Sequence, residues 1–272
     1  MTLCAELKSF RAQAAVAWLT SAIGGVLRSV EPPKEIRIRG ALAMEIDDPK
    51  IDALRKKVTA AQQEFDMAVT FHEVWKPAAY DQDLHSRLGK SYATQAFLIT
   101  RTALRREMLL ALIRMWDKNK QALGMHSVAE TLRREKGMID ALALDRVNHF
   151  DFPEAIDLLD EMKDDLGKKA AEADLLVKKY WKDGTHHAVF EKLKTFRDER
   201  LAHRQLAPAR ATGANATDEE IEEFYQDNSK LIHILLGVVN AMAYDPEDTA
   251  KVYRFYASHF WGAFQKTENK AR

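Results

Sequence analysis

Residues 49–75 read PKIDALRKKVTAAQQEFDMAVTFHEVW, and their apolar side chains recur at intervals of three and four residues. This spacing returns once per helical turn, so these side chains share one face of a helix. The positions on that face are Ile51, Leu54, Val58, Ala61, Phe65, Ala68 and the pair Phe71/His72. The stretch therefore predicts a long amphipathic helix, which Lys76-Pro77 is expected to end.

Similar apolar stripes continue along the chain and predict seven further helices. Capping boxes at Ser127–Glu130 and Thr217–Glu220 indicate two of the helix starts, and Pro153 and Asp245-Pro246 indicate two more. The helices are expected at about 83–122, 127–135, 138–145, 153–182, 185–206, 217–243 and 246–266. The glycine at Gly124 is expected to terminate the first of these.

Two other features support an all-α fold. Asp183-Gly184-Thr185 is expected to end one helix and to cap the next, so the connection between them is short. No stretch alternates apolar and polar residues over the length of a strand, and Ile36–Arg39 is an isolated strand-like tetramer. We predict an antiparallel helical bundle with long helices and an additional N-terminal arm.

Composition limits the classes of protein that this chain can belong to. Its 272 residues carry 41 Lys+Arg and 41 Asp+Glu, a formal net charge of +0, so any anion site must be a local patch. The single cysteine, Cys4, excludes a disulfide framework and favours a reducing, cytoplasmic location. Polar residues interrupt the apolar stretch Phe10–Leu27, so we expect neither secretion nor a membrane span.

Residues 1–43 are expected to be separate from the helical domain at 44–272. Glu31-Pro32-Pro33 breaks the chain, and nothing amphipathic connects it to Met44, which precedes a sequence typical of a protein start. Two interpretations stay open for residues 1–43: a loosely attached, disordered arm, or a miscalled upstream start.

One short stretch carries a candidate for chemistry. Residues 196–204 read FRDERLAHR, and Arg197, Arg200 and Arg204 form a basic ridge on a helix. Arg197 and His203 lie about 120° apart around the axis, and both could face one groove between packed helices. Histidine moves protons near neutral pH, and arginine binds a phosphate through two hydrogen bonds. The simpler interpretation is a solvated helix end.

Other candidates have a structural interpretation that we weigh beside the functional one. The pair His186-His187, with Glu191, is a weak zinc candidate, and Arg101, Arg105 and Arg106 form either a solvated face or an RNA contact. The aromatic residues near the C-terminus fit a core or a dimer seam better than a base-stacking platform. They are Tyr253, Phe255, Tyr256, Phe260, Trp261 and Phe264. No glycine-rich phosphate loop or nucleophile elbow is present, so we expect no cofactor and no metal.

The order arginine, polar residue, spacer and histidine in Arg197, Asp198 and His203 resembles the motif of the HEPN superfamily (higher eukaryotes and prokaryotes nucleotide-binding). The phrase FRDERLAHR is similar to its abortive-infection, AbiU-like branch. The segment Tyr92–Asp117 is similar to a long helix of that branch that ends in an Arg-x-x-Asp element, here Arg114 and Asp117. The resemblance covers roughly residues 50–245.

The resemblance implies a metal-independent endoribonuclease that acts as a homodimer in phage defence or as a toxin, with an antitoxin protein as a further partner. His203 would handle the proton of the 2′-hydroxyl or the leaving oxygen, Arg197 would stabilise the transition state, and Asp198 would orient Arg197 or the partner's histidine. RNA would be bound by Arg200, Arg204 and Lys194, and Arg114 and Asp117 would support the motif. The alternative is a helical module that binds a nucleotide, RNA or a partner without catalysis.

Overall fold

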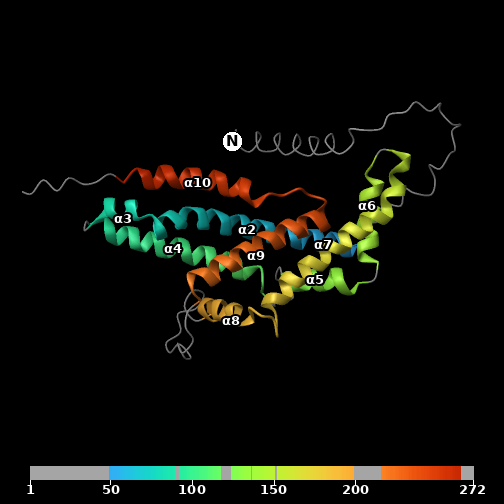
Figure 1. Cartoon of the computed structure of the whole chain (residues 1–272), viewed down its shortest axis with the longest axis horizontal. Helices are drawn as coiled ribbons and strands as arrows, with labels where there is room; N and C mark the ends of the chain where they lie inside the picture. The colour runs from blue at the N-terminus through green and yellow to red at the C-terminus, as the bar shows by residue number, and fades with distance from the viewer. Residues whose placement is uncertain are drawn as a thin grey trace, which may run out of the picture. The chain divides into compact units, whose positions relative to one another are not determined.

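The computed structural model describes residues 49–89, 92–117, 124–135, 137–150, 152–198 and 216–264, and these contain helices and no strand. The predicted all-α fold is therefore confirmed. The helices are α2 (Pro49–Tyr80), α3 (Gln82–Leu88), α4 (Ala93–Arg114), α5 (Met125–Arg134), α6 (Met138–Asn148), the 3-10 helix η1 (Pro153–Leu158), α7 (Leu159–Tyr180), α8 (His187–Phe196), α9 (Asp218–Asn240) and α10 (Pro246–Gly262) (Figure 1).

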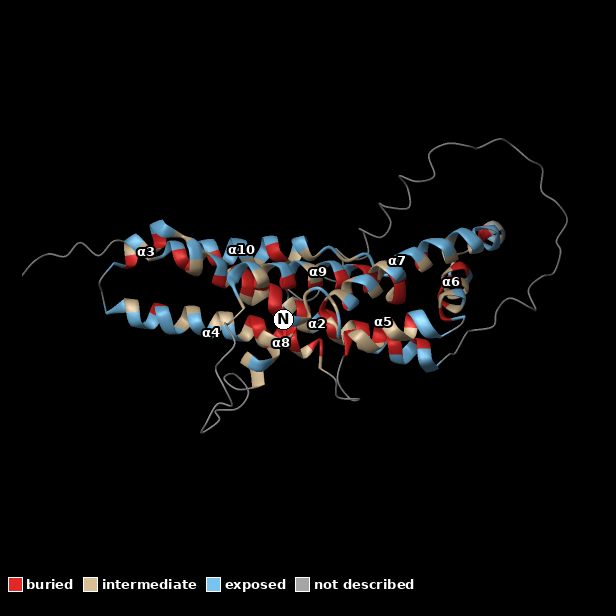
Figure 2. Ribbon diagram, turned by 60° about the horizontal axis from the view of Figure 1, so that its bottom comes forward, coloured by how far each residue is buried: buried red, intermediate tan, exposed pale blue. Residues whose placement is uncertain are grey.

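Helix α2 is the centre of the bundle. It packs against α4, α9 and α10, and α4 runs back beside it after the turn at α3 (Figure 1). The predicted stripe is its buried face, since Val58, Ala61, Phe65 and Ala68 are fully buried. Figure 2 shows buried residues along the faces that the helices turn toward one another. Burial of this face stabilises α2 far more than helix propensity does.

A second group of helices continues the core beyond α2. Helix α7 contacts α5, α6 and α9, so it links the helices at residues 125–148 to the central bundle. Their buried side chains belong to the same hydrophobic cluster as those of α2, including Val128, Leu142, Leu166 and Ala173. The described part of the chain thus has one main core, with a smaller cluster around Leu84, Phe97 and Trp261.

The first helix does not end at Pro77, contrary to the prediction. Helix α2 continues to Tyr80, because Ala78 is fully buried in the second cluster and holds the last turn against it. Proline has no N–H and frees the carbonyl of the preceding turn. The indole Nε1 of Trp261 donates to the neighbouring carbonyl of Val74 at 2.8 Å, so the chain supplies a tertiary hydrogen bond in this turn.

The predicted helix at 83–122 is two helices. Gly89 ends α3 with a φ of 53°, in the left-handed region that favours glycine, and α4 begins at Ala93. Helix α4 ends at Arg114, well before Gly124. Gly124 instead precedes α5, with a φ of 48°. The prediction was wrong because Gly89 lies inside the predicted range, and its left-handed backbone ends α3 and turns the chain before α4 begins.

The structure confirms one predicted capping box and contradicts the other. The Thr217 hydroxyl accepts from the Glu220 backbone, and the Glu220 carboxylate accepts from the Thr217 backbone, at the start of α9. At α5 the Ser127 hydroxyl donates to the Gly124 carbonyl at 2.8 Å, inside a helix that has already begun at Met125. The difference arises because only Thr217 has the extended backbone that a capping residue needs.

The turn between α7 and α8 depends on a close approach of two backbones. A side chain at Gly184 would overlap the carbonyl oxygens of Lys178 and Lys179, so this tight turn requires glycine. The expected cap from Asp183-Gly184-Thr185 is absent here, because the start of α8 has no side-chain cap and the Thr185 hydroxyl instead contacts His186 Nδ1. The helix predicted at 153–182 begins as the 3-10 turn η1 before α7.

Several predictions fall outside the described residues. They include the N-terminal arm at 1–43, the tetramer Ile36–Arg39 and the part of the motif beyond Asp198. Within the described residues, no helix combines the length and the apolar character needed to cross a membrane.

Candidate functional site

Four buried aromatic side chains hold together the helices that carry the motif. Trp116 follows α4, Tyr180 ends α7, Phe190 lies on α8 and Phe224 lies on α9. The Trp116 ring centroid lies 5.8 Å from Tyr180, 5.6 Å from Phe190 and 5.8 Å from Phe224. Trp116 Nε1 also donates to Asn228 Oδ1 at 2.8 Å, inside the core. The end of α4 and the middle of α8 are therefore fixed relative to one another.

Helix α8 places Arg197 directly after its last residue. Val189, Phe190 and Leu193 are buried and anchor α8 in the core. The Arg197 backbone N–H donates to the carbonyls of Leu193 and Lys194, so the helical path continues through the start of the motif. Anchoring of α8 therefore decides where the Arg197 side chain can reach.

Arg197 is held between two carboxylates. Its Nε donates to Asp198 Oδ1 at 2.7 Å, and its Nη1 lies 3.7 Å from Asp117 Oδ2. The Arg197 side chain is 18% exposed, whereas those of Asp117 and Asp198 are 43% and 45% exposed. The site is thus a partly buried guanidinium with two more exposed acids beside it.

The upstream Arg-x-x-Asp element contributes to two different contacts. Arg114 Nε donates to Glu64 Oε2 on α2 at 2.8 Å, and Asp117 faces Arg197. Arg114 therefore joins α4 to α2. Asp117 lies beside the motif, with its Oδ2 3.7 Å from Arg197 Nη1.

Of the predicted RNA-binding residues, the structure describes Lys194. It is half-buried on α8, with its Nζ 3.9 Å from Glu191 Oε2. His203, Arg200 and Arg204 lie outside the described residues, so the geometry that relates Arg197 to His203 stays a prediction.

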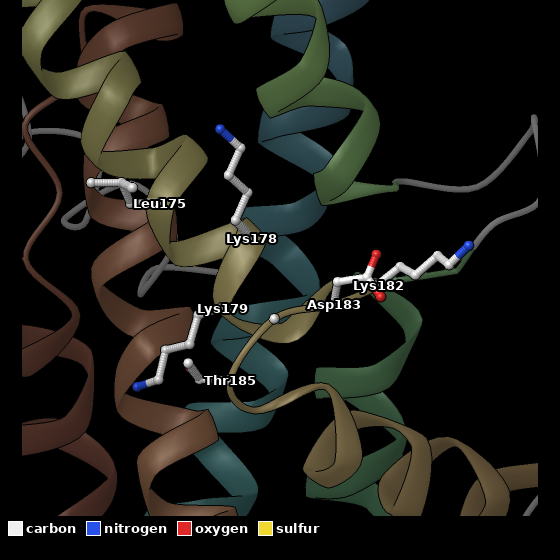
Figure 3. Close-up of a pocket in the computed structure, with 7 residues that line it drawn as sticks. Leu175, Lys178, Lys179, Lys182, Asp183 and Thr185 are labelled. Atoms are coloured by element: carbon white, nitrogen blue, oxygen red, sulfur yellow. The ribbon is translucent and has the colours of Figure 1, made fainter.

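A pocket of about 520 Å³ lies at the turn between α7 and α8, and three lysines line it. Figure 3 shows Lys178, Lys179 and Lys182 pointing in different directions. Lys179 binds Glu223 and Asp227 on α9 at 2.7 and 2.6 Å, and Lys178 binds Asp174 at 2.6 Å. These lysines do not converge on one point, so the pocket does not provide a concentrated anion site.

The adjacent histidines have separate partners. His186 Nε2 lies 3.3 Å from Glu223, whereas His187 Nδ1 lies 3.3 Å from the Tyr180 carbonyl and its Nε2 lies 4.0 Å from Glu191. In the part of the chain that the structure covers, no three His, Cys, Asp or Glu side chains are placed to hold a metal ion.

The three arginines of the basic cluster on α4, Arg101, Arg105 and Arg106, have different partners. Arg105 binds Asp218 at the start of α9 at 2.5 Å and lies over the Trp75 ring. Arg101 lies over Phe97, and Arg106 lies 3.7 Å from Glu107. Arg105 thus joins two helices, so the cluster is not a uniform surface for RNA.

The aromatic residues near the C-terminus differ in burial. Trp261 is buried in the core, whereas Phe255, Tyr256 and Phe260 are 59%, 52% and 53% exposed. The core interpretation was therefore wrong for these three rings, because only one face of α10 packs on α2.

The structure contains a buried ionic network around His72 that the sequence did not predict. His72 is 2% exposed, and its ring Nδ1 lies 3.1 Å from Glu73 Oε1 and its Nε2 lies 2.8 Å from Glu222 Oε2, so both carboxylates can accept from the ring. Its ring also stacks on Tyr225, with centroids 4.0 Å apart. Glu73 in turn accepts from Arg254 on α10 at 2.9 Å. The only signal in the sequence was a histidine on an otherwise apolar stripe.

The network should make stability depend on pH. Burial lowers the pKa of His72, but the bonds and charges of Glu222 and Glu73 raise it more, so the net shift is upward from 6.5. A raised folded-state pKa contributes stability that is complete below the unfolded pKa and is lost as pH rises through the folded value. Between pH 6 and 8 the parent Tm should therefore fall by a few degrees more than that of His72→Gln.

Thermal unfolding by circular dichroism at both pH values measures this difference. His259→Gln, which changes an exposed histidine on α10, is the matched control and should keep the parent's pH dependence. Equal pH dependence in the parent and His72→Gln would contradict the prediction.

Comparison with known proteins identifies the family of this chain. The profile of the HEPN AbiU2 family matches residues 51–260, which is most of the chain. The match runs from the third residue of α2 into the last turn of α10 and includes the Arg-x-x-Asp element and the complete motif. No curated protein and no solved structure matches the chain significantly. The match agrees with the resemblance seen in Arg197, Asp198 and His203 and with the all-α bundle described above. The chain therefore belongs to the HEPN AbiU2 family.

Proposed function

We propose that the protein is a metal-independent endoribonuclease that acts as a homodimer in phage defence by abortive infection, or as a toxin, in the cytoplasm. The observation that carries the proposal is the placement of Arg197, whose partly buried guanidinium stands at the end of a firmly anchored helix beside Asp198. A positioned arginine with low exposure suits the stabilisation of charge on a phosphate.

The proposed reaction uses the 2′-hydroxyl of the RNA as the nucleophile. His203 takes the proton of this hydroxyl or protonates the departing 5′-oxygen, and Arg197 stabilises the added charge on the phosphorus oxygens. The 2′-oxygen forms a bond to phosphorus as the bond to the 5′-oxygen breaks, which leaves a 2′,3′-cyclic phosphate and a 5′-hydroxyl. The 2.7 Å bond from Arg197 Nε to Asp198 supports an orienting role for Asp198.

A second copy would supply what one copy lacks. The formal net charge is +0, so affinity for RNA has to come from a local basic surface. Arg200, Arg204 and Lys194 are the residues proposed for this surface, and two copies would double their number in one cleft. In such a dimer, Arg197 and His203 can serve the same phosphate from different chains. An antitoxin protein is a further proposed partner.

The proposal is tested by incubating purified protein with single-stranded RNA in EDTA. We expect cutting by the parent, with 2′,3′-cyclic phosphate ends on the products, and no cutting by His203→Ala. His259→Ala is the matched control, because it removes an exposed histidine from α10. Cutting of RNA by His203→Ala at the parent rate would contradict the proposal. RNA binding by the parent without cutting would favour the alternative, a non-catalytic binding module.

A further inference from the structure

Arg197 is already engaged in the structure, although the proposed function requires it to bind a phosphate. Asp198 occupies its Nε at 2.7 Å, and Asp117 lies 3.7 Å from its Nη1. A phosphate that approaches Arg197 therefore meets two carboxylates at short range.

The two carboxylates differ in how they are held. Asp198 is the next residue in the chain and moves with Arg197. Asp117 belongs to a different part of the fold, directly after Trp116, which is 2% exposed and is bonded to Asn228. The backbone N–H of Met125 also donates to the carbonyl of Met115, two residues before Asp117, at 2.9 Å. The core therefore holds Asp117 in front of Arg197.

The geometry of the guanidinium decides which carboxylate a phosphate has to replace. Two-point binding of a phosphate needs two neighbouring N–H groups of the arginine. With Nε donating to Asp198, the edge formed by the two terminal nitrogens is left for the phosphate, and Asp117 faces one of these nitrogens. Asp117 and a phosphate thus compete for the same edge, whereas Asp198 can keep its bond.

We propose that Asp117 competes with the RNA phosphate for Arg197 and thereby limits RNA binding by the free protein. The proposal rests on the function proposed above only in assigning Arg197 to the phosphate. In this proposal Asp117 does not assist Arg197 in binding RNA. The Arg197–Asp117 contact has to break before the phosphate binds, so the contact weakens the affinity for RNA.

The test is the affinity of Asp117→Asn for a fluorescent single-stranded RNA with 2′-O-methyl sugars, which cannot be cut at the 2′-oxygen. Asparagine keeps the shape of aspartate and removes its charge. We expect Kd to fall roughly three- to fivefold at low salt, the effect of one partly exposed charge contact. Asp164→Asn, an exposed change on α7, removes the same charge away from Arg197 and should leave Kd unchanged.

A double-mutant cycle identifies the cause of any gain. In an Arg197→Ala background, Asp117→Asn should no longer strengthen binding, because the contested group is gone. Weaker or unchanged binding by Asp117→Asn, a gain that persists without Arg197, or no RNA binding by either protein would overturn the inference. Thermal unfolding of each variant verifies that the fold is intact.

These results are distinguishable from the outcome of the cleavage assay. Tighter binding by Asp117→Asn that depends on Arg197, combined with a parent that never cuts RNA, would support the competition and contradict the nuclease. Cutting by the parent with no change in the affinity of Asp117→Asn would do the reverse.

Discussion

Arg197→Ala is expected to lower kcat/KM for RNA cleavage in EDTA by roughly 10²–10³-fold, the usual effect of removing one group that stabilises transition-state charge. The loss should be large because Arg197 is partly buried, and charge interactions are stronger where water is partly excluded. Arg197→Lys should recover only part of the rate, since an ammonium lacks the planar pair of N–H groups. Initial rates on a fluorogenic RNA measure all three proteins.

The matched control for this prediction is Arg133→Ala. Arg133 also contacts a carboxylate, Asp174 at 3.5 Å, but it lies on α5 and is not part of the motif. Its variant should cut RNA at the parent rate. A rate for Arg197→Ala within threefold of the parent would exclude the proposed role of Arg197.

Mixing two inactive variants extends the same experiment to the dimer. If each site takes Arg197 from one chain and His203 from the other, a dimer of Arg197→Ala with His203→Ala keeps one complete site. Since half of the dimers are mixed after exchange, about a quarter of the parent activity should return. If both residues serve from one chain, no activity returns, and the shared site is contradicted.

Phe224→Ala is expected to lower the free energy of unfolding by about 3–5 kcal/mol, the cost of a large cavity in a packed core. Phe224 is fully buried and contacts Trp116, Tyr180 and Phe190, with its ring centroid 4.9 Å from that of Tyr180. Its loss removes the side chain between the end of α4 and α8. Urea denaturation followed by circular dichroism measures the change.

The matched control is Phe255→Ala, which truncates a ring of the same type that is 59% exposed on α10. It should change the free energy of unfolding by less than about 0.5 kcal/mol. A loss below about 1 kcal/mol for Phe224→Ala would mean that the core fills the cavity or that the aromatic cluster does not hold α4 and α8 together.

Most of the helices and the motif could be predicted from the sequence. The apolar stripe at 49–75, the Thr217–Glu220 capping box and the Asp245-Pro246 start all appear in the structure, because each is a pattern of residues that lie a few positions apart in the chain. Arg197 and Asp198 could be singled out for the same reason, since the motif is contiguous.

The ends of several helices and the contacts between distant side chains depend on how the helices pack, which the sequence patterns do not record. Burial of Ala78 carries α2 past Pro77, and the chain turns at Gly89 inside the range that the sequence predicted as one helix. His72 and Arg197 each have one partner that is distant in the chain, Glu222 on α9 for His72 and Asp117 after α4 for Arg197. Residues so far apart in the chain come together only through packing of the core, and no local spacing records that packing.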